Sequence, residues 1–147
     1  MALIIRSPET AEEWNQYFDL RWQLLREPWQ QARGSEKDEL EENSIHRCAL
    51  VDGKIVAVGR FHFLNPKEAQ IRYMAVMSEF QQQGIGQSLL QSLEARAVES
   101  SVNLMTLNAR ENAVAFYKKN NYVLIEESHT LYGKIKHFKM KRILTNL

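Results

Sequence analysis

The sequence is poor in cysteine and in long apolar runs. Cys48 is the only cysteine among 147 residues, so the chain cannot form an intrachain disulfide, and we expect Cys48 to be a core residue. No apolar stretch approaches the roughly 20 residues that a membrane-spanning helix needs. The first residues also lack the basic region and apolar run of a secretory signal. A disulfide scaffold and a membrane span are therefore excluded, and we expect a cytoplasmic protein with no membrane partner.

Net charge is nearly absent as well. The 19 Lys and Arg residues face 18 Asp and Glu residues, and 44% of the chain is hydrophobic. This balance gives no sign of a nucleic-acid-binding surface, an acidic tail or a disordered chain. There are no internal repeats, and 147 residues is an ordinary length for one domain. We therefore expect a single domain over residues 1–147, with no nucleic-acid partner.

The sequence does contain a glycine loop between an apolar strand and an amphipathic helix. The loop, residues 81–86, reads Gln-Gln-Gln-Gly-Ile-Gly. Gly84 and Gly86 have no Cβ, so the backbone can adopt unusual φ values and approach a ligand closely. The helix that follows presents unpaired N–H groups and the positive end of its dipole. Together these features predict a phosphate or other anion site.

The spacing separates three kinds of glycine loop. A Walker loop ends in Gly-Lys-Ser/Thr, and no such Lys follows Gly84 or Gly86. A dinucleotide fingerprint needs a third glycine where Leu89 stands. The pattern Q/R-x-x-G-x-G/A does fit, and with it the segment resembles the acetyl-CoA-binding motif of the GNAT superfamily of N-acetyltransferases.

A second segment strengthens the resemblance. Residues 108–122 follow an apolar strand and contain Asn112, the pair Phe116-Tyr117 and an aromatic residue after a tight turn. This is similar to the family's pattern of a strand, a short helix with Asn, Ala and Phe-Tyr, and a further strand. Asn121 stands where the family usually has glycine, and asparagine is the non-glycine residue that best tolerates a positive φ.

The order of predicted elements agrees with this family. We expect an α/β (α+β) fold: a mixed, mostly antiparallel central sheet of about six to seven strands flanked by helices. The predicted strands are 2–6, Ile45–Val51, Lys54–Phe63, Ala69–Met77, Val102–Leu107, Tyr122–Glu127 and Lys134–Ile143, the last at a sheet edge. The predicted helices run from a cap at Ser7 to about Arg26, from the glycine loop to about Ser100, and over Glu111–Lys119. Asp52-Gly53 is a strong hairpin signal.

The resemblance implies acetyl-CoA as the cosubstrate and assigns its binding residues. These would be Met74, Ala75, Val76, Gln81, Gln82, Gln83, Gly84, Ile85, Gly86, Gln87, Ser88, Asn112, Phe116 and Tyr117. In the family, backbone N–H groups of the loop bind the pyrophosphate, and a bulged strand before the loop holds the pantetheine arm. Tyr117 matches the tyrosine that donates a proton to the departing thiolate, and Asn108 would orient a water molecule. No metal is expected.

The residue that accepts the amine's proton stays open. The candidates are the carboxylates Glu36, Asp38, Glu39, Glu41, Glu42, Glu68 and Glu79 and the imidazoles His46, His62, His129 and His137. An ordinary exposed carboxylate titrates near 4 and needs a perturbing site to act as a base at pH 7. Arg21, Arg26 and His137 match a subgroup of the family and are predicted to bind the acceptor.

Two other functions are compatible with the motifs. One is a non-catalytic acyl-CoA sensor, and the other is a module that binds a different nucleotide with the same loop. If the chain is an enzyme, direct attack of a primary amine on the thioester in a ternary complex is the family's usual course. The acceptor would be a small-molecule or peptide amine, and the family's frequent dimerisation through the last strands leaves a homodimer open.

Overall fold

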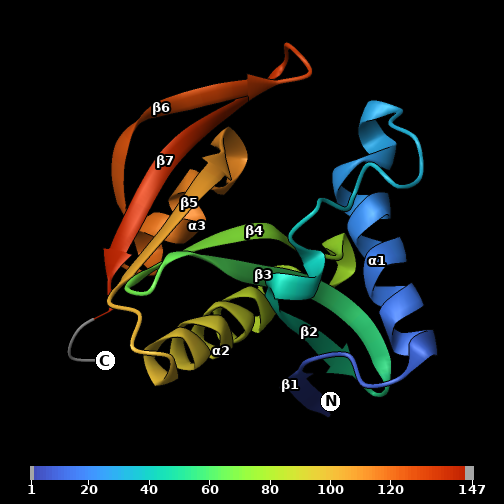
Figure 1. Ribbon diagram of the computed structural model, residues 1–147. Coiled ribbons are helices and arrows are strands. Elements are labelled where there is room, and N and C mark those ends of the chain that lie inside the picture. Colours follow the sequence, from blue (N-terminus) through green and yellow to red (C-terminus); the bar gives the residue numbers. More distant parts are fainter. Residues whose placement is uncertain (1, 145–147) are drawn as a thin grey trace.

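The computed structural model describes residues 2–144 as one mixed sheet with helices on both faces (Figure 1). The seven strands lie in the order β1-β2-β3-β4-β5-β7-β6. Neighbours are antiparallel except β4 and β5, which are parallel. The strands are β1 Leu3–Arg6, β2 Ile45–Val51, β3 Lys54–Asn65, β4 Glu68–Val76, β5 Leu104–Arg110, β6 Val123–Leu131 and β7 Ile135–Ile143. The seven strands and their mostly antiparallel pairing confirm the predicted fold class.

Three α-helices cover the sheet: α1 Ala11–Leu25, α2 Ile85–Glu99 and α3 Val114–Lys119. Short 3-10 turns are η1 Glu27–Trp29, η2 Glu41–Asn43, η3 Ser78–Phe80 and η4 Glu111–Ala113. In the described part of the chain, no helix is long and apolar enough to cross a membrane.

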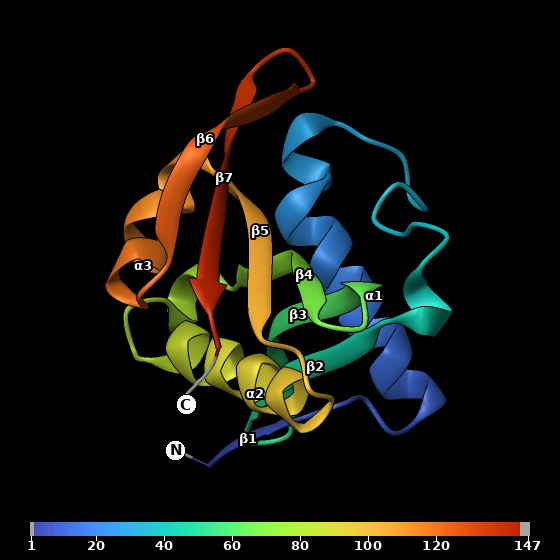
Figure 2. The same ribbon diagram turned by 60° about the vertical axis from the view of Figure 1, so that its left-hand side comes forward.

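Successive side chains of β2 point to opposite faces of the sheet and contribute to a separate core on each face. Cys48 and Leu50 pack with Tyr17 and Leu20 of α1, whereas Ala49 packs with residues of α2. Figure 2 shows α1 behind the sheet and α2 in front of it. Because successive strand residues point to opposite faces, one strand supplies both layers. The buried Cys48 is a core residue, as expected.

Most predicted elements are confirmed, with two corrections. Helix α1 is capped by Thr10, whose hydroxyl accepts the Glu13 N–H at 3.1 Å, so Ser7 is not the cap. Strand β7 is not at an edge: it lies between β5 and β6, and its Ile135 and Met140 are buried. The alternation of lysines along β7 comes from its one exposed face, and exposed β6 forms the edge.

Strand β4 is bulged and then leaves its parallel neighbour. Between the pairs Val58–Ala75 and Arg60–Arg72 it carries one more residue than β3, and Tyr73 there has φ +56°. Pairing with β5 ends at Ile71–Leu107, so the last residues of β4 have no strand partner on that side. The bulge and the splay open a wedge in the middle of the sheet.

Candidate active site

A cleft of about 1350 Å³ occupies this wedge. Its walls come from both separating strands, from the glycine loop and α3, and from the end of α1 and the β6–β7 hairpin. Predicted site residues that line it are Arg26, Met74, Ala75, Val76, Gln81, Gln82, Gly84, Gly86, Gln87, Asn108, Asn112, Phe116, Tyr117 and His137. Residues far apart in sequence, from the end of α1 to β7, therefore meet in one cavity.

The glycine loop presents a row of unused donors. Among the described residues, no hydrogen bond uses the backbone N–H groups of residues 82–87, while Ser88 N–H already donates to Gly84 O at 3.0 Å. Gln82 and Gly84 have positive φ values of +62° and +81°, which turn the chain into the start of α2. Unpaired N–H groups at a helix N-terminus are well suited to bind an anion.

Gly86 has a different role from Gly84. Its φ is not positive, but an added Cβ would lie 3.3 Å from the Phe116 ring and 3.5 Å from a methyl group of Val76. Glycine at position 86 therefore lets α2 approach α3 and β4 closely. The loop is also tied to β4, because the Gln81 amide donates to Val76 O at 3.0 Å.

Three polar side chains of β5, η4 and α3 face the cleft without partners of their own. Tyr117 is 7% exposed, and neither its hydroxyl nor the amides of Asn108 and Asn112 form a hydrogen bond with the described residues. Burial raises the pKa of Tyr117 above its ordinary value, so the hydroxyl stays protonated at neutral pH. A protonated hydroxyl in a cleft can donate a proton or a hydrogen bond.

Two histidines lie at the hairpin end of the cleft. The rings of His129 and His137 stack with centroids 4.2 Å apart. Nδ1 of His137 lies 2.9 Å from Ile135 O, and a carbonyl can only accept, so Nδ1 carries the proton and Nε2 is the basic nitrogen. Burial lowers the pKa of His137, with the positive charge of Arg110 adding to the effect. His137 is thus a neutral imidazole at pH 7.

The other candidate bases lie elsewhere. No Asp or Glu lines the cleft among the described residues. His46 is bonded on both ring nitrogens, to the Tyr17 hydroxyl at 2.9 Å and to Glu41 O at 2.8 Å. His62 is buried outside the cleft. No group of His, Cys, Asp and Glu side chains in residues 2–144 is arranged to hold a metal ion.

A closed cluster of polar side chains lies under α1; we use this name for Tyr17, Arg21, Asp38, Glu41, His46 and Arg60. Arg60 makes a bidentate pair with Asp38 at 2.7 and 2.8 Å, and Arg21 donates to Glu41 at 2.9 Å. The acidic residues of the long 29–44 loop thus neutralise buried arginines. Asp38 is held by Arg60, and its pKa falls to about 2 despite partial burial.

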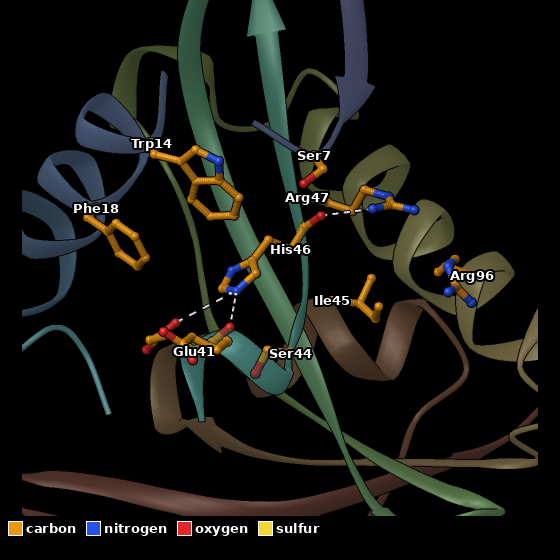
Figure 3. Close-up of a pocket in the computed structure, with 10 residues that line it drawn as sticks. Ser7, Trp14, Phe18, Glu41, Ser44, Ile45, His46, Arg47 and Arg96 are labelled. Carbon is orange, nitrogen blue, oxygen red and sulfur yellow. Dashed lines mark hydrogen bonds and ion pairs between the residues drawn. The ribbon is translucent and has the colours of Figure 1, made fainter. Parts of the chain in front are cut away.

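A second, smaller hollow of about 420 Å³ lies beside the closed cluster (Figure 3). Trp14 and Phe18 of α1 and His46 of β2 lie along it, and the His46 ring faces Glu41. The Trp14 and Phe18 rings are stacked 5.8 Å apart, and Trp14 meets His46 edge-on at 5.0 Å. Since these side chains contact one another and the closed cluster, the hollow belongs to the packing of α1 on the sheet.

Four predicted site residues do not line the cleft. Ile85 is 1% exposed and packs in the core, and Ser88 is in the first turn of α2. Gln83 turns its amide to Glu79 O at 3.1 Å. Arg21 is fully buried in the closed cluster, so the structure does not place it where an acceptor could touch it.

Several lining residues were missed at the sequence level. Arg72 and Tyr73 come from the bulged part of β4, and Arg110 ends β5. The sequence pattern carries no signal for a bulge, so the direction of Tyr73 could not be read from it. Arg110 does follow an apolar strand at the end that opens into the cleft, which is a usual place for functional side chains in such sheets.

Comparison with known proteins gives consistent matches. Residues 14–122 match the sequence model described as the acetyltransferase (GNAT) family. An uncharacterised N-acetyltransferase of Bacillus subtilis, YjcF, is 30% identical over 107 residues, which cover 73% of this chain and 76% of that protein.

Solved structures share the fold. An aminoglycoside 6'-N-acetyltransferase complexed with coenzyme A superposes with a TM-score of 0.82 at 15% identity, over 100% of this chain and 99% of the other. The ribosomal-protein-S18-alanine N-acetyltransferase of Escherichia coli gives a TM-score of 0.75 at 18% identity, over 99% of both chains. At these identities the likeness is one of fold.

Proposed function

The chain belongs to the acetyltransferase (GNAT) family, and from that premise we propose that it transfers an acetyl group from acetyl-CoA to a primary amine by direct attack in a ternary complex. The observation that carries this proposal is the row of unpaired N–H groups at residues 82–87, which lies at the mouth of a cleft between separated strands. A pyrophosphate fits such a row because it needs several donors and no side-chain cation.

The cleft has a place for each part of the cosubstrate. The loop would hold the pyrophosphate, with Asn112 and Phe116 beside it. Met74, Ala75 and Val76, which have no strand partner towards β5, would line the pantetheine arm. A backbone N–H near Ala75 would polarise the thioester carbonyl, and such a donor is typically worth several kcal/mol of barrier.

Two side chains would move protons. We assign Tyr117 as the donor to the departing thiolate, since its raised pKa keeps it protonated and its hydroxyl has no other partner among the described residues. We assign His137 as the acceptor of the amine's proton, directly or through water oriented by Asn108. A neutral imidazole near pH 7 suits that task better than a carboxylate that titrates near 4.

A ligand-dependent melting experiment tests the binding part of this proposal. Acetyl-CoA or CoA at about one hundred times its dissociation constant should stabilise the protein by roughly 2.7 kcal/mol, whereas ATP and NAD should not. Gly84→Ala tests the loop itself. The added methyl group contacts no neighbour but strains a residue with φ +81°, so the variant should show a smaller shift with CoA. A melting temperature that rises with ATP or NAD and not with CoA would contradict the acetyltransferase proposal.

The location and assembly state stay predictions. A cytoplasmic enzyme fits the balanced composition of the chain. A homodimer through the last strands is open, because exposed β6 is the edge of the sheet there and carries apolar Val123 and Ile125. Sedimentation at micromolar concentration decides between monomer and dimer.

A further inference from the structure

The acceptor end of the cleft contains one buried and one half-buried arginine, and no carboxylate of the described residues neutralises either. Arg26, at the end of α1, is 7% exposed, and Arg110, at the end of β5, is half-buried. Among the described residues neither one forms a salt bridge. Both guanidinium groups donate to the same acceptor, Leu25 O, each at 3.1 Å. Two positive charges are therefore held side by side with one shared carbonyl between them.

Other buried arginines in this part of the protein do have acidic partners. Arg21 contacts Glu41 at 2.9 Å, and Arg60 contacts Asp38 at 2.7 Å. Arg72, which is exposed and also lines the cleft, contacts Asp38 at 3.1 Å. Buried charges are normally paired, because removing an unpaired ion from water is costly. Arg26 and Arg110 are exceptions to a rule that their own neighbours obey.

The positive charge of Arg26 acts on Arg110. Burial lowers the pKa of Arg110, and the positive charge of Arg26 lowers it further. Among the described residues the Arg26 guanidinium makes one other hydrogen bond, from Nε to Ser35 O at 3.0 Å, so its remaining guanidinium N–H groups are available to a ligand. A planar anion that accepts from both guanidinium groups would relieve the repulsion and satisfy these donors.

The position of the pair distinguishes it from the phosphate loop. The loop is tied to Val76 through Gln81, whereas the Arg26 guanidinium lies 5.5 Å from the ring of Tyr73 in the bulge. Tyr73 and Val76 are three residues apart on β4, so the arginine pair and the loop contact different parts of this strand. Arg110 is also the register partner of His137 on β7. In Figures 1 and 2 the end of α1 and the β6–β7 hairpin lie at the same end of the molecule.

We propose that Arg26 and Arg110 bind an anionic group of the acceptor, so that the substrate is a primary amine that carries a carboxylate or a phosphate. The inference rests on the proposed function, since it names the class of amine used at that site. It excludes polyamines and aminoglycosides as preferred acceptors: a cleft lined by Arg26, Arg110 and Lys119, with no Asp or Glu among its described lining residues, repels a polycation.

Paired acceptors that differ only in the anionic group test the proposal. Suitable pairs are phenylalanine and phenylalaninamide for a carboxylate, and phosphoethanolamine and ethanolamine for a phosphate, with spermidine as a polycation. Release of the CoA thiol gives kcat and KM. In the wild type, kcat/KM should be at least about tenfold higher for the anionic member of one pair, and that pair identifies the group. Equal or better use of phenylalaninamide, ethanolamine and spermidine would overturn the proposal.

Substitution of each arginine tests whether the pair causes the preference for anionic amines. Arg26→Met and Arg110→Met should each lower kcat/KM for the preferred anionic amine about 100-fold, mainly through KM, and leave its uncharged counterpart unchanged. Arg33→Met is the matched control, because Arg33 is exposed, pairs with Asp19 outside the cleft and should leave both acceptors unchanged. A loss that is equal for the anionic and the uncharged amine would indicate a structural role and contradict the proposal.

A binding readout separates this inference from the proposed function. In protein saturated with CoA, phenylalanine or phosphoethanolamine should raise the melting temperature of the wild type, and Arg26→Met with Arg110→Met should abolish that rise. If CoA itself gives no shift, the proposed function fails, and the same anion titration without CoA still tests the arginine pair. No anion-dependent shift in either state would overturn the inference.

Discussion

The closed cluster under α1 and the polar side chains of the cleft contain the same residue types with different partners. Each has a buried tyrosine, a buried histidine and two arginines; both arginines of the closed cluster are buried, and in the cleft Arg26 is buried and Arg110 half-buried. In the closed cluster Asp38 and Glu41 neutralise the arginines, and the Tyr17 hydroxyl bonds to His46 and Gly59 O. In the cleft the arginines share one carbonyl and the Tyr117 hydroxyl has no partner among the described residues. The partners, and not the residue types, separate structural from functional groups.

The largest expected effect comes from breaking the closed cluster. Asp38→Asn removes the bidentate partner of the fully buried Arg60, which keeps only Glu41 at 2.7 Å. Breaking a buried pair typically costs up to about 3–5 kcal/mol of unfolding free energy. Urea unfolding measures the loss. Asp19→Asn is the control, because its exposed pair with Arg33 should contribute less than about 1 kcal/mol. If Asp38→Asn lowers the unfolding free energy as little as Asp19→Asn does, the closed cluster does not stabilise the fold.

The two tyrosines give the next contrast. Tyr117→Phe should lower kcat at least about 100-fold by removing the proton donor, with less than a twofold change in the dissociation constant of CoA. Tyr17→Phe should instead lower the unfolding free energy by about 1–3 kcal/mol, because it leaves buried partners unsatisfied. Thiol release and urea unfolding on both variants check this. An unchanged kcat in Tyr117→Phe would remove that residue from the chemistry.

The two histidines should also differ, with His137 needed for turnover and His46 for stability. His137→Gln should lower kcat about 10- to 100-fold by removing the proton acceptor. The pKa of His137 is lowered, so in the wild type its basic form persists below pH 6.5. The kcat of the wild type should therefore decrease only below pH 6.5, as His137 becomes protonated. His137→Gln should not show this decrease. His46→Gln should alter stability and leave this limb in place. An acid limb that persists in His137→Gln would exclude His137 as the base.

The smallest effect is the pH dependence of the closed cluster. The pKa of Asp38 is about 2 in the folded protein against an ordinary value of 3.8. A depressed folded pKa stabilises the protein above the unfolded value, and that contribution is lost as the pH falls towards 2. The difference in urea midpoint between wild type and Asp38→Asn should therefore shrink from pH 5 to pH 2. A difference in urea midpoint that stays constant from pH 5 to pH 2 would show that the negative charge of Asp38 does not contribute to stability.

Local patterns in the sequence predicted most of the fold. The hairpin at Asp52-Gly53 forms, with φ values of +50° and +86°, because both residues tolerate that region. Asn121 takes φ +73° where a glycine was expected, as predicted from its tolerance of positive φ. The interior position of β7 could not be predicted, because strand order depends on long-range pairing that alternation along a single strand does not encode.

The candidate site was predictable where backbone geometry defines it and unpredictable where distant side chains meet. The glycine loop follows from its own spacing. Arg21 lies on α1 and Arg26 caps it five residues later. Their difference depends on which one meets Glu41 from the 29–44 loop and which one lies near Arg110 of β5. No pattern in either segment carries that information.

The position of β7 between β5 and β6 constrains the order of folding. Strand β6 precedes β7 in the chain but reaches the sheet only through it, so the two must dock on β5 as a preformed hairpin or β6 must wait for β7. Pairing between distant segments is slow, whereas the loop and α2 are local to β4. The phosphate loop can thus form before His137 comes to lie opposite Arg110. A refolding chain should bind CoA earlier than it gains the ability to acetylate an amine.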